Sequence, residues 1–184
     1  SNQALAVITK RHPDFRPKVA VVLGSGLGGL AAHLDAAPPI PYDALPGFPK
    51  PGVSGHQGQL ILASAGDTPV ALLEGRAHLY EDGRADAMAV AVRTMAGLGC
   101  EALVLTNAAG GLDPDMEPGS VMLLTDHLNF TGQSPLFGLP GDDRFVDMTQ
   151  AYDLGLRHRL LAVAAEMDLP LHQGVYAWFA GPQF

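Results

Sequence analysis

Apolar runs and helical patterns alternate along the chain. Residues 18–23 (KVAVVL) are nearly all apolar, which is typical of a strand covered on both faces of a sheet. Residues 59–63 and 69–73 predict two more strands, and Gly66-Asp67 between them predicts a tight hairpin. Further strands are predicted over residues 102–106, 121–125 and 173–180.

Two segments have the composition of helices. Residues 85–98 are rich in Ala, Met and Val with no breaker before Gly97, and residues 152–167 are amphipathic, with Thr149 or Asp153 as the candidate cap. Strands that alternate with helices are typical of an α/β fold. We therefore expect one α/β domain over residues 1–184, in which helices flank a mixed, mostly parallel, twisted sheet. Residues 129–148 predict a long irregular segment, of a length that is usually functional or disordered.

Composition narrows the classes of partner. The 184 residues are 47% hydrophobic and 16% charged, which allows a large core, and the formal net charge is −8. This charge disfavours broad attraction to nucleic acid or to an anionic membrane surface. An anionic ligand would therefore have to be held by a local cluster of donors.

Cys100 is the single cysteine, so the chain forms no internal disulfide and has no cysteine-rich metal site. It precedes an apolar run without a neighbouring base, which favours a packed thiol over a nucleophile. No His, Asp or Glu grouping has metal-ligand spacing, and no serine lies in a GxSxG elbow. No apolar stretch has the length of a membrane span or of a signal peptide core, and a cytoplasmic location is expected.

A glycine-rich turn, Gly24-Ser25-Gly26-Leu27-Gly28-Gly29, follows the first predicted strand and precedes a predicted helical segment. Such turns let backbone N–H groups converge on an anion, and Ser25 adds a hydroxyl donor. The string also satisfies GxGxxG, so a dinucleotide-binding protein is an alternative. That alternative needs an acidic residue after a second strand, and Asp43, the nearest one, lies among prolines. A turn that only packs strand against helix is a further alternative, and the turn alone is weak evidence for an anion site.

The segment Glu74-Gly75-Arg76-Ala77-His78-Leu79-Tyr80-Glu81 follows a buried-looking strand. In an extended chain Arg76, His78 and Tyr80 project to one face, where a guanidinium and an imidazole would hold phosphate and the phenol would suit a sugar. Pairing of Arg76 with Glu74 or Glu81 at a solvated edge is the alternative. Ligands of open α/β sheets bind at the carboxyl ends of strands, and this segment follows such an end. This position favours a ligand-binding role for the three residues over the solvated ion pair.

Two further turns contain small residues. His56 lies between flexible residues in Gly55-His56-Gln57-Gly58, which fits either a loop that closes over a ligand or a plain turn. The segment Thr106-Asn107-Ala108-Ala109-Gly110-Gly111 follows another predicted strand, and its small side chains would let a flat ligand approach the backbone. A buried turn is the alternative.

Taken in order, these segments resemble the homotrimeric purine nucleoside phosphorylase family. The matching strings span almost the whole chain from Val19 and are VVLGSGLGGL at 21–30, GHQG at 55–58, GRAHLYE at 75–81, TNAAGGL at 106–112, DHLNFTGQSPL at 126–136, DRF at 143–145 and AGPQF at 180–184. The family pattern departs from this chain at Asp82, where glycine is common, and continues beyond Phe184 for about another third of the chain, with the glutamate that reads the purine. The resemblance therefore implies a nucleoside phosphorylase fold without its C-terminal third.

The resemblance also implies roles for individual residues. Ser25, His56, Arg76, His78 and the backbone at Ala108 would bind phosphate. Tyr80, Tyr176 and the Phe145 of a neighbouring subunit would contact ribose, and Phe184 and Ala108 would contact the base. The implied reaction, part of purine salvage, is phosphorolysis of purine nucleosides to free base and ribose 1-phosphate, with inorganic phosphate as co-substrate and without a metal or organic cofactor. The alternatives are a methylthioadenosine phosphorylase, a non-catalytic ligand-binding or trimerising protein, and an NAD-binding Rossmann protein.

Overall fold

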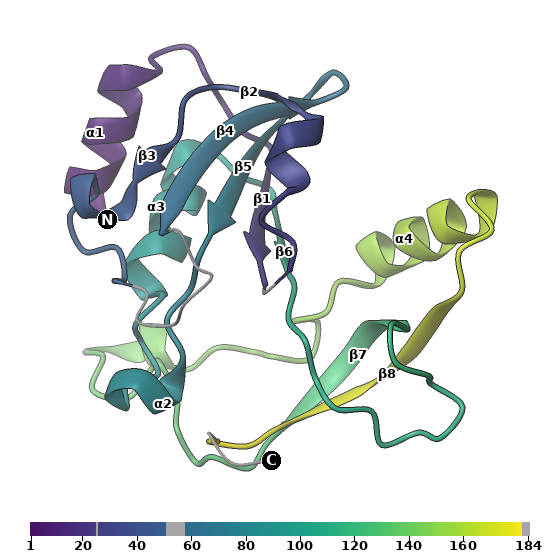
Figure 1. The fold of residues 1–184 in the computed structure, drawn as a ribbon. Helices are drawn as coiled ribbons and strands as arrows, with labels where there is room; N and C mark the ends of the chain where they lie inside the picture. Colours follow the sequence, from purple (N-terminus) through teal and green to yellow (C-terminus); the bar gives the residue numbers. More distant parts are fainter. Residues whose placement is uncertain (25, 51–57, 182–184) are drawn as a thin grey trace. The chain divides into compact units, whose positions relative to one another are not determined.

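The computed structural model of the chain describes residues 1–24, 26–50 and 58–181. They divide into two units, Ser1–Ala108 and Ala109–Phe184, and each unit is described by itself (Figure 1). The expected mixed α/β class is confirmed. The expected single domain over residues 1–184 stays a prediction.

The first unit contains a six-stranded sheet in the order β2-β4-β5-β1-β6, with β3 paired to β4. Strand β1 is parallel to both β5 and β6, whereas β4 is antiparallel to β5, β2 and β3. The sheet is thus parallel on one side and antiparallel on the other. Its strands are β1 (Val19–Leu23), β2 (Asp35–Ala36), β3 (Ile40–Pro41), β4 (Gln59–Ala65), β5 (Thr68–Glu74) and β6 (Ala102–Leu105).

The predicted hairpin joins β4 to β5. Ala65 is the register partner of Thr68, and Gly66 in the turn has a φ of 58°, which glycine adopts without a steric penalty. Because both strands are apolar along their middle, each contributes side chains to both faces of the sheet. The sequence pattern was sufficient for this part of the fold.

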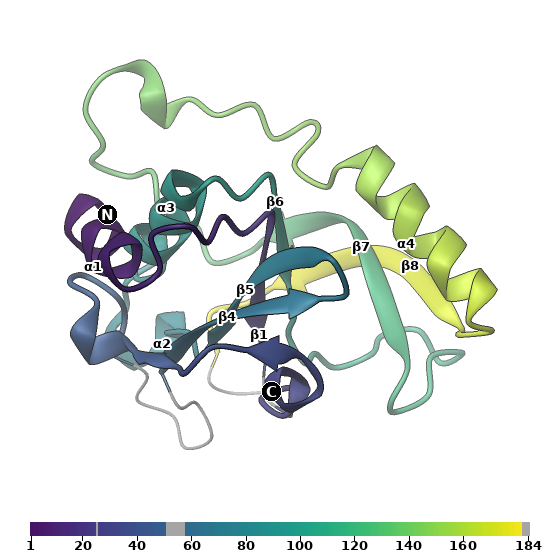
Figure 2. The ribbon, with the colours of Figure 1, turned by 90° about the horizontal axis from the view of Figure 1, so that it is seen from above.

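Helices cover one face of the first sheet. Ala4 and Ile8 of α1 (Asn2–Arg11) and Ala91, Met95 and Leu98 of α3 (Ala89–Leu98) pack in one core cluster with inward residues of the sheet. The two helices lie side by side (Figure 2), where a Cβ on Gly97 would approach Leu5 to 3.2 Å. The sequence did not predict α1, and α3 begins four residues later than expected, because residues 85–88 form a turn in which the Ala89 amide bonds the Asp86 carbonyl.

Short helical turns connect the remaining elements of the first unit. The segment after the glycine-rich turn forms only a 3₁₀ helix, η1 (Leu30–His33), instead of the expected α-helix. Asp43 lies in the 3₁₀ helix η2 (Tyr42–Ala44) and not at the end of a second strand, so the Rossmann alternative loses its acidic residue. The short helix α2 (Leu79–Asp82) follows β5.

The second unit is a strand–helix–strand arrangement. Strands β7 (Val121–Asn129) and β8 (Leu171–Trp178) are parallel, and α4 (Leu154–Glu166) connects them. Of the two candidate caps, Asp153 is the correct one, because its carboxylate accepts the Leu156 N–H at 2.7 Å. The segment between β7 and α4 is irregular, as predicted, apart from the 3₁₀ helix η3 (Asp142–Arg144). None of the described helices is long and apolar enough to cross a membrane.

Candidate functional site

Three parallel strands of the first unit end at one edge of the sheet. Leu23 of β1 is in register with Glu74 of β5, and Val22 is in register with Leu105 of β6. Because parallel strands present their carboxyl ends together, the segments that follow β5, β1 and β6 meet at this edge. These segments are the ones in which the sequence predicted an anion site.

Thr106 connects the ends of β1 and β6. Its hydroxyl accepts the Gly24 N–H at 2.8 Å and donates to the Val22 carbonyl at 2.9 Å. A Cβ on Gly24 would lie 2.8 Å from the Thr106 carbonyl oxygen, so the close approach of the two backbones requires glycine here. The beginning of the glycine-rich turn is therefore fixed by the adjacent strand.

Arg76 extends from β5 toward the end of β6. Its Nη1 donates to the Thr106 carbonyl, and its Nε donates to Nε2 of His78 over 3.4 Å, a long and weak hydrogen bond. The preceding residue, Gly75, has a φ of 133°, a conformation that side chains rarely adopt. A guanidinium held next to Thr106 places positive charge at the carboxyl edge of the sheet, where an acidic protein needs it to bind an anion.

His78 is held by Glu81. One carboxylate oxygen of Glu81 lies 2.6 Å from Nδ1 of His78 and accepts the backbone N–H of the same residue at 2.8 Å. Glu81 is the N3 residue of a capping box at the start of α2: its carboxylate caps the His78 backbone, and its own N–H donates to the His78 carbonyl at 3.0 Å. A proton on Nδ1 satisfies Glu81 and leaves Nε2 to accept from Arg76, which is the tautomer that this network favours.

The prediction of an extended chain from Arg76 to Tyr80 is wrong at Tyr80. Tyr80 lies in α2 and not in an extended chain, because the capping box turns the backbone into a helix directly after His78. Its ring nevertheless stacks on the His78 imidazole, with centroids 4.9 Å apart. Tyr80 is 46% exposed, so its phenol lies at the surface beside the imidazole.

The structure brings Arg76 and His78 together, and Ala108 is exposed two residues after Thr106. The predicted residues Ser25, His56 and Phe184 lie outside the described part of the chain. Among the described residues, no group of three or more His, Cys, Asp or Glu side chains is placed to hold a metal ion. Burial raises the pKa of the Cys100 thiol, which supports the expected packed thiol over a nucleophile.

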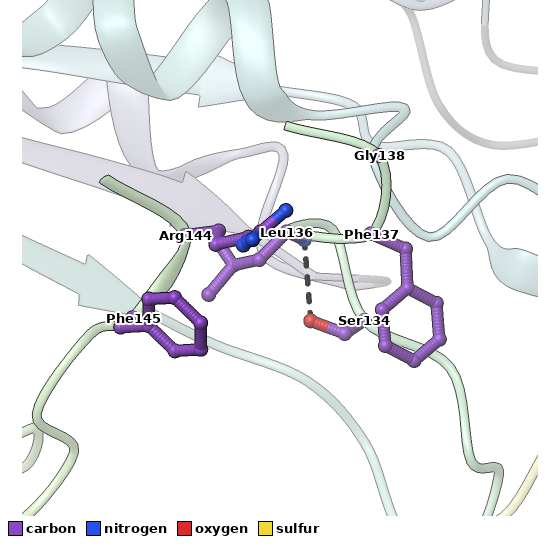
Figure 3. Close-up of a pocket in the computed structure, with 6 residues that line it drawn as sticks. All are labelled: Ser134, Leu136, Phe137, Gly138, Arg144 and Phe145. Carbon is purple, nitrogen blue, oxygen red and sulfur yellow. Dashed lines mark hydrogen bonds between the residues drawn. The ribbon is translucent and has the colours of Figure 1, made fainter. Parts of the chain in front are cut away.

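The remaining predicted residues belong to the second unit. Tyr176 lies on β8, in register with His127 of β7, and is half-buried. Phe145 follows η3 and is 73% exposed. Together with five neighbours it lines a pocket of about 320 Å³, in which the Leu136 amide donates to the Ser134 hydroxyl (Figure 3). The other lining residues are Phe137, Gly138 and Arg144.

Sequence reasoning missed what Thr106 and Glu81 do in the site. The spacing of Glu81 three residues after His78 is that of a capping box, and this signal was present, although histidine is an unusual cap. Thr106 offered no local signal, because its partners Val22 and Gly24 are more than eighty residues away. Its contacts depend on the pairing of β1 with β6.

Comparisons with known proteins agree with this fold. The family model described as "Phosphorylase superfamily" matches residues 18–184. The purine nucleoside phosphorylase of Mus musculus is 42% identical over 95% of this chain, and purine nucleoside phosphorylase 1 of Bacillus subtilis is 39% identical over 99% of it. The chain spans 63% and 68% of the lengths of these two relatives.

A solved structure shows the same fold. Isoform 2 of the purine nucleoside phosphorylase from Schistosoma mansoni, in complex with cytosine and ribose-1-phosphate, superposes with a TM-score of 0.90 at 35% identity. The match covers the whole of this chain and 67% of that structure. The chain therefore belongs to the phosphorylase superfamily and, within it, to the purine nucleoside phosphorylase family.

Proposed function

We propose that the protein containing this chain cleaves the N-glycosidic bond of purine ribonucleosides and deoxyribonucleosides with inorganic phosphate. The products are the free purine and ribose 1-phosphate or deoxyribose 1-phosphate. One observation supports this most directly: Arg76 and His78 meet beside Thr106 at the carboxyl edge of a parallel sheet. The relative from Schistosoma mansoni, whose structure contains ribose-1-phosphate, supports the same substrate class.

The physical chemistry of phosphorolysis suits such a cluster. Bond cleavage gives the sugar oxocarbenium character, so a phosphate anion beneath the anomeric carbon acts both as nucleophile and as electrostatic stabiliser. A phosphate group carries about −1.5 to −2 charge near neutrality. In a chain of net charge −8, this anion needs local donors. Arg76 and backbone N–H groups supply them, and His78 adds another when its Nε2 carries a proton and no longer accepts from Arg76. The proposed reaction uses no metal or organic cofactor.

The proposal extends to the residues that the family resemblance implies. Ser25, His56 and the backbone at Ala108 complete the phosphate site. Tyr80 and Tyr176 contact the ribose, and Phe184 contacts the base together with Ala108. In a homotrimer, the exposed Phe145 of a neighbouring subunit covers the sugar, for which its 73% exposure leaves it available. A cytoplasmic location is part of the same proposal.

The test is base release from inosine and guanosine by the natural protein that contains this chain, with and without phosphate. We expect release only with phosphate, ribose 1-phosphate as the second product, and no effect of a metal chelator. Hydrolysis without phosphate would contradict the proposal. Preferential cleavage of 5′-methylthioadenosine would assign the chain to that alternative substrate, and absence of any cleavage would favour a non-catalytic protein.

A further inference from the structure

A buried tyrosine contacts the backbone next to the anion-site arginine. The Tyr42 side chain in η2 is 3% exposed, and its O–H donates to the Gly75 carbonyl at 3.0 Å. The two residues are 33 positions apart in the sequence, so only the fold brings them together. Gly75 directly precedes Arg76, and this hydrogen bond therefore acts on the peptide unit that joins them.

The peptide at Gly75 needs to be held. Its φ of 133° lies outside the conformations that define a strand, so the pairing of β5 ends at Glu74 and no longer fixes the chain direction. A glycine has the largest backbone freedom of any residue. Without an external contact, small rotations at Gly75 would displace the guanidinium relative to Thr106.

The geometry of Tyr42 suits it to this task. Its ring packs edge-to-face on Phe48, with centroids 5.1 Å apart, so the ring position is set by the core. Burial, and secondarily the Glu74 carboxylate, raise the pKa of the Tyr42 phenol. The phenol therefore keeps its proton at every pH near neutrality and remains a hydrogen-bond donor.

Glu74, the residue before Gly75, is fixed through its side chain. Its side chain is buried, and one oxygen accepts from Nε2 of Gln59 on the neighbouring strand at 2.6 Å. Within the described residues the other oxygen, Oε1, is buried without a hydrogen-bond partner. A buried acceptor of this kind lowers stability, and an aliphatic residue, as at Leu72, would fill the strand position better. Stability alone therefore does not account for this carboxylate.

We propose that Tyr42, through its hydrogen bond to the Gly75 carbonyl, and Glu74, through its hydrogen bond from Gln59, are positioning residues that fix the backbone around Gly75 and thereby set the direction of the Arg76 guanidinium for anion binding. Neither residue is required to touch the anion. The inference rests on the proposed function only in taking phosphate as that anion.

The decisive variant is Tyr42→Phe, which removes the O–H and keeps the ring on Phe48. Its matched control is Ile8→Val, a loss of one methylene from the same core cluster without any polar change. The dissociation constant of inorganic phosphate is measured by calorimetry on the natural protein, together with the thermal midpoint and the KM values of phosphate and inosine.

We expect Tyr42→Phe to weaken phosphate binding about threefold to tenfold, the range of one hydrogen bond, with the inosine KM unchanged. Ile8→Val lowers the thermal midpoint without this effect. Phosphate affinity of Tyr42→Phe equal to the wild type, or weakened no more than in the control, would overturn the proposal. A wild-type protein that binds no phosphate would also overturn the proposal.

Glu74 is tested with two substitutions. Glu74→Gln keeps a carbonyl acceptor for Gln59 and removes the charge, and it is expected to bind phosphate at least as tightly as the wild type. Glu74→Ala removes the contact and is expected to bind more weakly. If the alanine variant bound phosphate as tightly as the wild type, Glu74 would not be a positioning residue. Because phosphate binding is read without turnover, these results stand apart from the phosphorolysis assay: a wild type that binds phosphate and releases no base contradicts the proposed function alone.

Discussion

A single oxygen of Glu81 holds both the ring and the main chain of His78. It lies 2.6 Å from the imidazole Nδ1 and 2.8 Å from the backbone nitrogen of the same residue. On its opposite side the imidazole accepts from Arg76, which in turn donates to the Thr106 carbonyl. The candidate anion site is therefore one connected set of hydrogen bonds that runs from α2 to the end of β6.

Glu81→Ala should remove both contacts that hold His78, one to its imidazole and one to its backbone N–H. The variant loses the cap of α2, at about 1 kcal/mol of unfolding free energy, and frees the imidazole to rotate. We expect weaker phosphate binding by calorimetry and a lower midpoint in urea. Glu81→Gln, which keeps one acceptor, should retain more of both. Phosphate affinity unchanged in the alanine variant would show that the orientation of His78 does not matter for the anion.

Arg76→Ala should remove most of the anion affinity. Hydrogen bonds to charged groups contribute about 1.5–3 kcal/mol each, so kcat/KM for phosphate should fall by about 100-fold or more. Thermal stability should change little, since Arg76 is only half-buried. Arg84→Ala is the control, because Arg84 forms an exposed pair with Asp86 that contributes little. If kcat/KM for phosphate were the same in Arg76→Ala as in Arg84→Ala, Arg76 would be a residue of a solvated edge without a role in anion binding.

Thr106→Val should destabilise the first unit through hydrogen bonds alone. Valine has nearly the same shape, but it leaves the Gly24 N–H and the Val22 carbonyl without their side-chain partner. The expected loss is about 1–3 kcal/mol of unfolding free energy, measured by urea denaturation. Thr106→Ser keeps the hydroxyl and should lose clearly less. A serine variant as unstable as the valine variant would assign the effect to the methyl group.

Gly24→Ala tests the close approach of β1 and β6. The added Cβ would lie 2.8 Å from the Thr106 carbonyl oxygen and 3.1 Å from Cα of Asn107, both of which are backbone atoms. Because a backbone cannot rotate away as a side chain does, we expect a loss of about 1–3 kcal/mol in unfolding free energy. Gly28→Ala is the matched control, since no atom lies within 4 Å of its added Cβ. Similar stability of the two variants would mean that β6 shifts without penalty.

Local patterns were enough to predict many of the helices and strands and to nominate candidate site residues, whose roles stay predictions. Continuous apolar runs predicted β1 and the hairpin of β4 and β5, and the side-chain types at Arg76 and His78 predicted an anion site. The same reasoning was wrong about the extended backbone expected at Tyr80 and about the helix expected after Gly29, because both depend on how the backbone turns after a strand. The predicted role of Tyr80 stays a prediction. The helix α1 was missed, since its mean hydropathy is low and its buried face is limited to Ala4 and Ile8.

By itself, the sequence determined the α/β class, the apolar strands and the positions of the candidate site residues. These follow from periodicity and residue type, which are local properties. The tertiary structure alone decided that Thr106 joins Gly24, and that Tyr42 reaches Gly75, because strand order and register set contacts between residues far apart in the chain. The candidate anion site takes its residue types from the sequence and its geometry from the pairing of β5, β1 and β6.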